Sequence, residues 1–184
     1  MLEENSPQLT DLLQQAQAAR LANQLDHAAR LLGAAFEKHP DALPVTKELA
    51  LLHQQRGEWP EARDCLELIL AQEPQNAQAL NVLGQMCHVQ GHLIEALGHW
   101  QQAVEIAPDY AEAWQNIGLA HEHLDQQPEA IAAHQQAVRL LPDNARAHRL
   151  LGMAQLDYGL LPAANHCVDR ALALNPDDPE NQWQ

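Results

Sequence analysis

Residues 77–110 of the 184-residue chain read AQALNVLGQMCHVQGHLIEALGHWQQAVEIAPDY, and residues 111–144 read AEAWQNIGLAHEHLDQQPEAIAAHQQAVRLLPDN. Aligned without a gap, the two stretches place glycine, alanine and proline at the same positions. The proline recurs along the whole chain at intervals of 34 residues, at Pro40, Pro74, Pro108, Pro142 and Pro176. Self-similarity at one fixed period predicts a stack of repeated structural units.

The closing prolines set the register, because proline ends a helix and the following chain can begin the next one. The array is predicted to span residues 9–178, as repeats 9–42, 43–76, 77–110, 111–144 and 145–178. Residues 1–8 are expected to be an N-terminal tail, and residues 179–184 the start of a truncated further helix or a linker. Each repeat is predicted to contain a helix, a tight turn and a second helix.

The small and short polar residues of the repeat predict where the chain turns, where paired helices approach closely and where helices begin. Glycine suits a left-handed turn residue, and asparagine and aspartate tolerate that conformation next best. The turns are therefore assigned to Asn23, Gly57, Gly91, Asp125 and Gly159. In the first helices Gly84, Gly118 and Gly152 are expected to face Ala96, Ala130 and Ala164, so that paired backbones approach closely. Asp41, Asp109, Asp143 and Asp177, each directly after a proline, are expected to cap the next helix.

The third repeat carries the residues Leu80, Leu83, Gly84, Gly91, Ala96, Trp100, Ala103 and Pro108. This pattern resembles the tetratricopeptide repeat, with leucine for the usual tryptophan and Trp100 for the later aromatic residue. The fourth and fifth repeats keep most of the pattern, and the first two keep the alanine and the proline. The resemblance implies an all-α fold, a right-handed α-solenoid of helix-turn-helix repeats with a concave and a convex face.

The composition of the chain limits the kinds of partner that it is expected to bind. Ten lysines and arginines against 25 aspartates and glutamates give a formal net charge of −15, which would repel both nucleic acid and an anionic membrane. No apolar run is long enough to cross a membrane. Three cysteines that are far apart in the sequence do not predict a disulfide framework, so a reducing cytoplasm is the expected location.

Chemistry-bearing residues do not form a recognised catalytic motif, and the chain is predicted not to be an enzyme and to need no cofactor. Eleven histidines invite a metal hypothesis. However, His53, His121 and His134 take packing positions of the repeat, and His88 and His92 straddle a turn. Cys65, Cys87 and Cys167 also fall on packing positions. No metal site is predicted.

The resemblance also implies a binding surface, because exposed residues on the first helix of each repeat line the concave groove in this family. Carried over to this sequence, the peptide-binding residues are predicted to be Gln17, Arg20, Lys47, Gln54, Asn81, Gln85, His88, Gln115, Asn116, Leu119, Arg146, Arg149 and Met153. These side chains are rich in amides and cations, which suits an extended peptide. The alternative is that the amides only solvate this face.

The resulting functional hypothesis is a scaffold that binds a protein or an extended peptide through its groove. By analogy with related arrays, it would be the N-terminal interaction module of a larger protein, leading a transferase-type catalytic domain. The alternative is a self-assembling structural protein that forms homo-oligomers through its uncapped end and groove.

Overall fold

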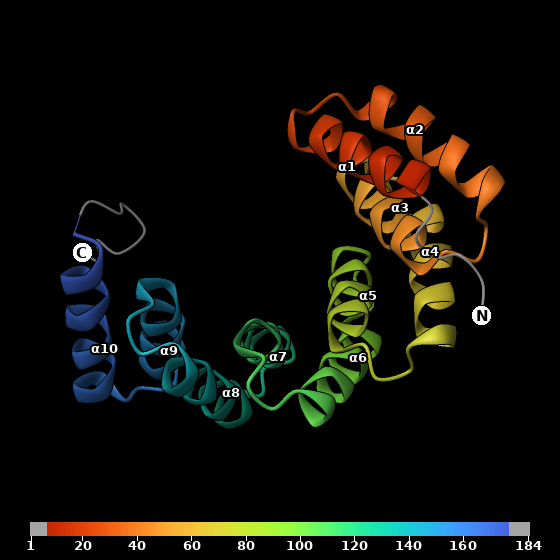
Figure 1. Ribbon diagram of the computed structural model, residues 1–184. Coiled ribbons are helices and arrows are strands. Elements are labelled where there is room, and N and C mark those ends of the chain that lie inside the picture. Colours follow the sequence, from red (N-terminus) through yellow and green to blue (C-terminus); the bar gives the residue numbers. More distant parts are fainter. Residues whose placement is uncertain (1–6, 177–184) are drawn as a thin grey trace. The chain divides into compact units, whose positions relative to one another are not determined.

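A computed structural model of the protein describes residues 7–176, and all regular structure within this range is α-helical (Figure 1). The helices are α1 (Pro7–Leu21), α2 (Leu25–Lys38), α3 (Leu43–Arg56), α4 (Trp59–Gln72), α5 (Ala77–Val89), α6 (Leu93–Ile106), α7 (Ala111–His123), α8 (Gln127–Leu140), α9 (Ala145–Asp157) and α10 (Leu161–Leu174). Most of the predicted N-terminal tail and the whole of the predicted 179–184 segment lie outside the described residues. Within the tail, Pro7 and Gln8 already belong to α1, a difference of the size usual at helix ends.

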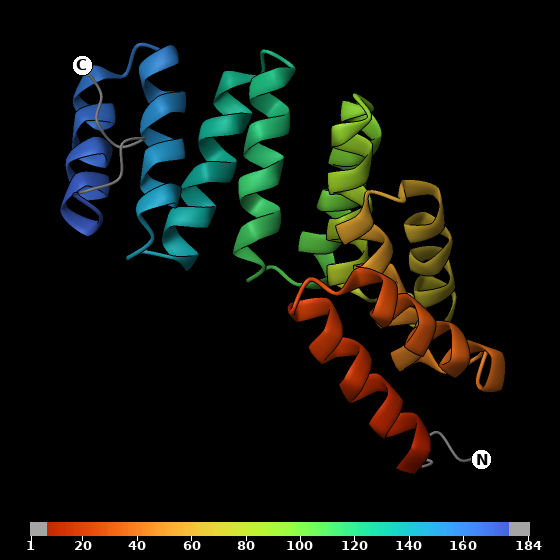
Figure 2. The ribbon, with the colours of Figure 1, turned by 90° about the horizontal axis from the view of Figure 1, so that it is seen from above.

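The chain divides into two compact units, Met1–Ala79 and Leu80–Gln184. In the first unit α1 packs on α2, α3 packs on α4, and α3 also contacts both α1 and α2. In the second unit α7 packs on α8 and α9 on α10, while α6 contacts α7 and α8 contacts α9 (Figure 2). Odd-numbered helices are the first helices of the repeats, and α7 also contacts α9 directly.

The turns inside the repeats have the backbone conformation that the sequence predicts. Gly57, Gly91 and Gly159 have φ angles of 72°, 83° and 84°, and Asn23 and Asp125 have φ angles of 58° and 56°. Positive φ reverses the chain at the end of the first helix and lets the second helix fold back on it. The assignment of these five turn residues is confirmed.

The predicted helix caps are wrong. The N-cap residues of α3 and α7 are Ala42 and Tyr110, and neither helix has a side-chain cap hydrogen bond. Asparagine caps two other helices instead: the Asn76 side chain accepts from the Ala79 backbone N–H at 2.9 Å, and Asn144 accepts from Ala147 at 2.9 Å. Each of these helices starts one residue later than the prediction required, so the aspartate after the proline lies outside the capping position. Asp177 lies outside the described residues.

In the third and fourth repeats, aromatic rings lie nearest to the glycines of the first helices, Gly84 and Gly118. A Cβ atom added at Gly84 would lie 2.5 Å from the Trp100 indole, and one added at Gly118 would collide with the His134 imidazole. Only at Gly152 does the expected alanine, Ala164, lie among the nearest neighbours. Ala96 and Ala130 are completely buried, so they fill the same core beside the rings.

Candidate peptide-binding face

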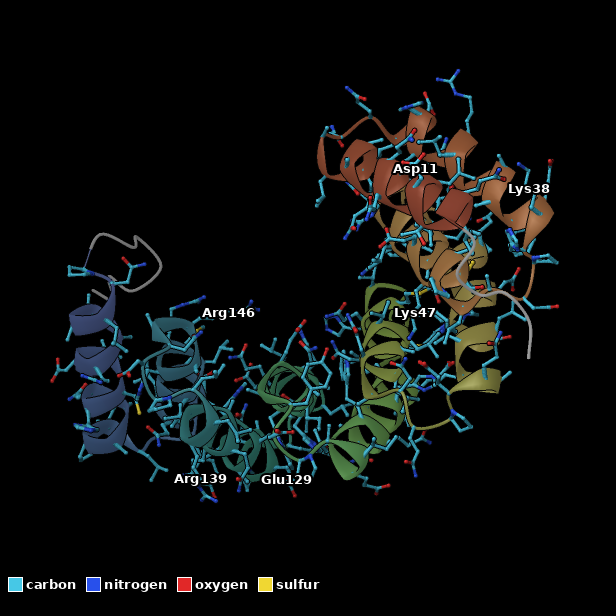
Figure 3. All side chains as sticks on the ribbon, in the orientation of Figure 1. Asp11, Lys38, Lys47, Glu129, Arg139 and Arg146 are labelled. Atoms are coloured by element: carbon cyan, nitrogen blue, oxygen red, sulfur yellow. The ribbon has the colours of Figure 1, made fainter. Side chains whose placement is uncertain are left out.

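The first helices of the fourth and fifth repeats, α7 and α9, are neighbours in the second unit. α7 and α9 contact each other, and helical spacing places residues three, four and seven apart on the same side of each helix. We define a surface, called the α7–α9 face, by Glu112, Asn116, Leu119, Arg146, Arg149 and Met153. In Figure 3, Arg146 of α9 lies on the opposite side of the unit from Arg139 and Glu129 of α8.

The two cations among the predicted groove residues of the first unit, Arg20 and Lys47, are engaged in ion pairs. Gln17 is exposed and Gln54 is half-buried. The Arg20 Nε lies 3.1 Å from a carboxylate oxygen of Glu48, which joins α1 to α3. The Lys47 ammonium lies 2.8 Å from Glu73, and hydrogen bonds from Lys47 and Asn76 lower the pKa of the Glu73 carboxyl. Both cations therefore already have partners within the unit.

Two predicted groove residues of the second unit are buried. Asn81 is only 2% exposed, and Gln115 is also buried. The Asn81 amide donates to the Tyr110 hydroxyl at 3.1 Å and accepts from the Asn116 amide at 3.0 Å. Burial, followed by the Glu112 charge, raises the pKa of Tyr110. This network joins neighbouring repeats, and Asn81 at its centre is shielded from solvent.

Gln85 and His88 lie on α5 beside this network, and both are half-buried. The Gln85 amide donates to Glu112 at 2.9 Å. The His88 ring lies 5.9 Å from the Trp100 ring and 5.3 Å from the His123 ring, centroid to centroid. Burial and, to a smaller extent, the charge of His123 lower the pKa of His88, which favours the neutral imidazole.

The remaining predicted residues present ligand-binding chemistry at the surface. Arg146 is exposed, whereas Asn116, Leu119, Arg149 and Met153 are half-buried. Arg146, Arg149 and Met153 follow the i, i+3, i+7 spacing of one helical stripe. Arg146 forms no ion pair with any residue in the described range 7–176. The α7–α9 face therefore combines the guanidinium of Arg146, which has no ion-pair partner among the described residues, with the Arg149 guanidinium, the Glu112 carboxylate, and apolar and amide groups.

The sequence analysis did not predict a group of three metal-binding side chains that the structure brings together. In the third repeat, ligand atoms of Cys87, Glu95 and His99 lie within 4.8 Å of one another. The spacing of Glu95 and His99, four residues apart on one predicted helix, was the available signal. Cys87 could be added only by knowing how the two helices of the repeat pack.

None of the helices that the structure describes is long and apolar enough to cross a membrane.

Three sequence models of the tetratricopeptide repeat match the chain, over residues 19–86, 75–143 and 128–179. Comparison with curated protein sequences gives no match. Among solved structures, MamA from Desulfovibrio magneticus RS-1 is similar with a TM-score of 0.81 and 19% identity, covering 95% of this chain and 98% of that one. PilF from Pseudomonas aeruginosa has a TM-score of 0.82 and 18% identity, covering 95% and 80%.

The protein YrrB is also similar, with a TM-score of 0.72 and 20% identity over 92% of this chain and 88% of that one. At these identities the structural likeness establishes the fold alone. The family models together span residues 19–179 and agree with the succession of helices α1 to α10 in the described part of the chain. The chain belongs to the tetratricopeptide repeat family, and its fold is an all-helical α-solenoid.

Proposed function

We propose that the protein is a non-catalytic scaffold whose α7–α9 face binds an extended peptide of a partner protein. The observation that carries the proposal is the exposed Arg146, which has no ion-pair partner among the described residues although the chain has a net charge of −15. A guanidinium left unengaged in an acidic protein suits a carboxylate on a ligand.

The neighbouring groups indicate which kind of peptide fits. Leu119 and Met153 are half-buried apolar side chains on α7 and α9, and methionine adapts to irregular apolar partners. Asn116 uses one amide hydrogen on Asn81, so its second amide hydrogen and its carbonyl oxygen can bind a peptide backbone. The proposed ligand is an extended segment with an acidic residue beside an apolar one.

The structural relatives support this proposal at the level of the fold. YrrB is described as a tetratricopeptide repeat protein with an unusual peptide-binding site. The same repeat architecture can therefore carry a peptide site, while the ligand is set by the particular side chains on each array.

Replacement of Arg146 by glutamate should weaken peptide binding about tenfold or more, equivalent to ~1.4 kcal/mol. Peptides would be selected from a displayed random library with the intact chain, and their affinities measured by fluorescence anisotropy. The matched control is Arg139→Glu, the same charge change on the exposed side of α8, which should leave affinity unchanged. Equal losses in both variants, or failure to select any binding peptide, would contradict a site on the α7–α9 face.

A second candidate function is self-association, favoured by apolar side chains around the turn between α9 and α10. Leu156, Tyr158, Leu160 and Leu161 are all more than two-fifths exposed. Clustered exposed apolar groups are typical of protein-interaction surfaces. This surface lies at the other end of α9 from Arg146.

If this patch joins two copies, Leu161→Lys should weaken dimerisation about tenfold or more, because a charge would be buried at the contact. Sedimentation equilibrium over a range of protein concentrations measures the change. Leu21→Lys is the matched control, since Leu21 is an exposed leucine at the turn of the first repeat. A wild-type chain that stays monomeric at all concentrations would exclude this second function.

A further inference from the structure

Three metal-binding side chains converge in the third repeat, outside the α7–α9 face. The Cys87 thiol, a carboxylate oxygen of Glu95 and a ring nitrogen of His99 all lie within 4.8 Å of one another. The His99 Nε2 is 3.9 Å from the nearer Glu95 oxygen, and the His92 Nδ1 is 3.7 Å from the other one. Among the described residues, this is the one such group of three.

The repeat itself brings these groups together. Cys87 lies near the end of α5, and the left-handed Gly91 turns the chain so that α6 folds back along α5. Glu95 and His99 are four residues apart on α6, which places them on one side of that helix. Ala96, between them, is completely buried, so this part of α6 lies close to its neighbours.

The donor set selects a class of metal. A thiolate and an imidazole favour zinc and similar borderline-soft ions, whereas magnesium and calcium prefer oxygen ligands. In a tetrahedral zinc site, bond lengths of about 2.0–2.3 Å place the ligand atoms roughly 3.5 Å apart. The three side chains need to close by about 1 Å to reach that geometry, a shift within the range of side-chain rotation.

The three side chains of the group differ in how far they are exposed to solvent. Cys87 is fully buried, the His99 side chain is 24% exposed and the Glu95 side chain is 48% exposed. A metal ion could therefore enter from the Glu95 side and be held against the buried thiol. A water molecule can reach the fourth position from the same side, as in zinc sites with three protein ligands.

The second repeat provides an internal comparison. It carries the same three residue types at the same repeat positions, with His53 for Cys87, Glu61 for Glu95, and Cys65 for His99. There the His53 Nδ1 is 2.7 Å from Glu58, and these three residues do not form a metal-binding group. Burial and the Asp64 charge raise the pKa of the Cys65 thiol. The convergence is therefore a property of the third repeat and not of the repeat positions.

We propose that Cys87, Glu95 and His99 bind one Zn²⁺ ion, with water as the fourth ligand, and that the ion fastens α6 to α5. The thiol loses its proton to solvent when the zinc–sulfur bond forms, and no oxidant or reductant is needed. Binding to the folded chain alone stabilises it by linkage. The proposal concerns a different surface from the peptide-binding face and stands independently of it.

The test uses the full chain, stripped of metal with a chelator and titrated with Zn²⁺ in competition with a chromophoric zinc indicator. We expect one Zn²⁺ per wild-type chain and an increase in Tm on binding. With Co²⁺ as a spectroscopic substitute, a thiolate-to-cobalt charge-transfer absorption should appear. His99→Gln and Glu95→Gln should each weaken zinc binding about tenfold or more, the scale of loss seen even for groups that only orient ligands.

Matched cysteine variants separate this site from the other thiols. Cys65→Ser should keep stoichiometric zinc binding and the charge-transfer absorption, whereas Cys87→Ser should lose the absorption. Because Cys87 is buried, circular dichroism checks that each variant is folded, and the partly exposed His99→Gln variant decides the question if Cys87→Ser does not fold. Absence of saturable zinc uptake by the wild type, or uptake by His99→Gln equal to that of the wild type, would overturn the proposal.

Discussion

Replacing Trp100 with alanine should lower the free energy of unfolding by about 3–5 kcal/mol, the usual cost of truncating a buried large aromatic side chain. Trp100 is only 2% exposed, and its indole nitrogen donates to the Asn81 carbonyl at 3.1 Å. Its ring also covers Gly84. Removal leaves a cavity between the two helices of the third repeat and deletes this hydrogen bond. Urea unfolding followed by far-UV circular dichroism measures the loss.

Trp114→Ala is the matched control for this prediction. Trp114 is half-buried, and its indole nitrogen donates to the Pro108 carbonyl at 2.9 Å. The same atoms are deleted, but less surface returns to water and solvent can fill the space. The free-energy loss should be clearly smaller than for Trp100→Ala. Equal losses for the two tryptophans would show that burial in the third repeat does not set the stability there.

Gly118→Ala should lower the free energy of unfolding by about 1–3 kcal/mol, the range expected for overpacking a core. Alanine is the better helix former by ~1 kcal/mol, but its Cβ would collide with the His134 ring. His134 is completely buried and its Nε2 lies 3.1 Å from a Glu122 oxygen. The ring must therefore move at the expense of its own packing. Thermal and urea unfolding check the sign and size of the change.

Gly98→Ala is the matched control, and it should change the free energy of unfolding in the opposite direction. Gly98 lies within α6, and nothing lies within 4 Å of a Cβ added there. Alanine at this position should stabilise the chain by up to ~1 kcal/mol through helix propensity and a less flexible unfolded state. In addition, Gly118→Ala combined with His134→Ala should lose less than the sum of the single losses. If the two glycine substitutions change stability in the same direction, the close contact at Gly118 is not limiting.

A substitution that lowers the stability of one repeat should affect the rest of the array only through the contacts between neighbouring repeats. In repeat proteins, stability is close to a sum of unit and interface contributions. The Asn81, Tyr110 and Asn116 network belongs to the interface between the third and fourth repeats. A change at Trp100, which bonds to Asn81, therefore acts on that interface as well as on its own repeat.

The helical architecture was predictable because its signals are local. The prolines at intervals of 34 residues and Gly91 at a turn act on their own backbone, so the residue type alone carries the information. The caps were predicted less well. Asp109 and Tyr110 are adjacent, and the start of α7 decided between them. Such a difference of one residue lies below the accuracy of a pattern-based boundary.

The proposed binding face could be predicted from the sequence only as a list of positions. Helical spacing places Asn81 and Asn116 on the first helices, but it does not reveal that the two amides bond to each other. Likewise, the sequence does not reveal that Glu48 lies beside Arg20 or that Arg146 has no such partner among the described residues. These outcomes depend on side chains from different helices, and the selection of Arg146 as the central residue came from the structure.

By itself, the sequence determined the repeat, its period, the turn residues and the all-helical class, because each of these follows from the backbone preferences of single residues or from one helical period. Only the tertiary structure decided which polar side chains are buried and which pairs meet. It brings Cys87, Glu95 and His99 together but leaves the equivalent His53, Glu61 and Cys65 apart. The physical reason is that a convergence of side chains depends on how two helices pack and which rotamers their neighbours allow, and neither is encoded at a single position.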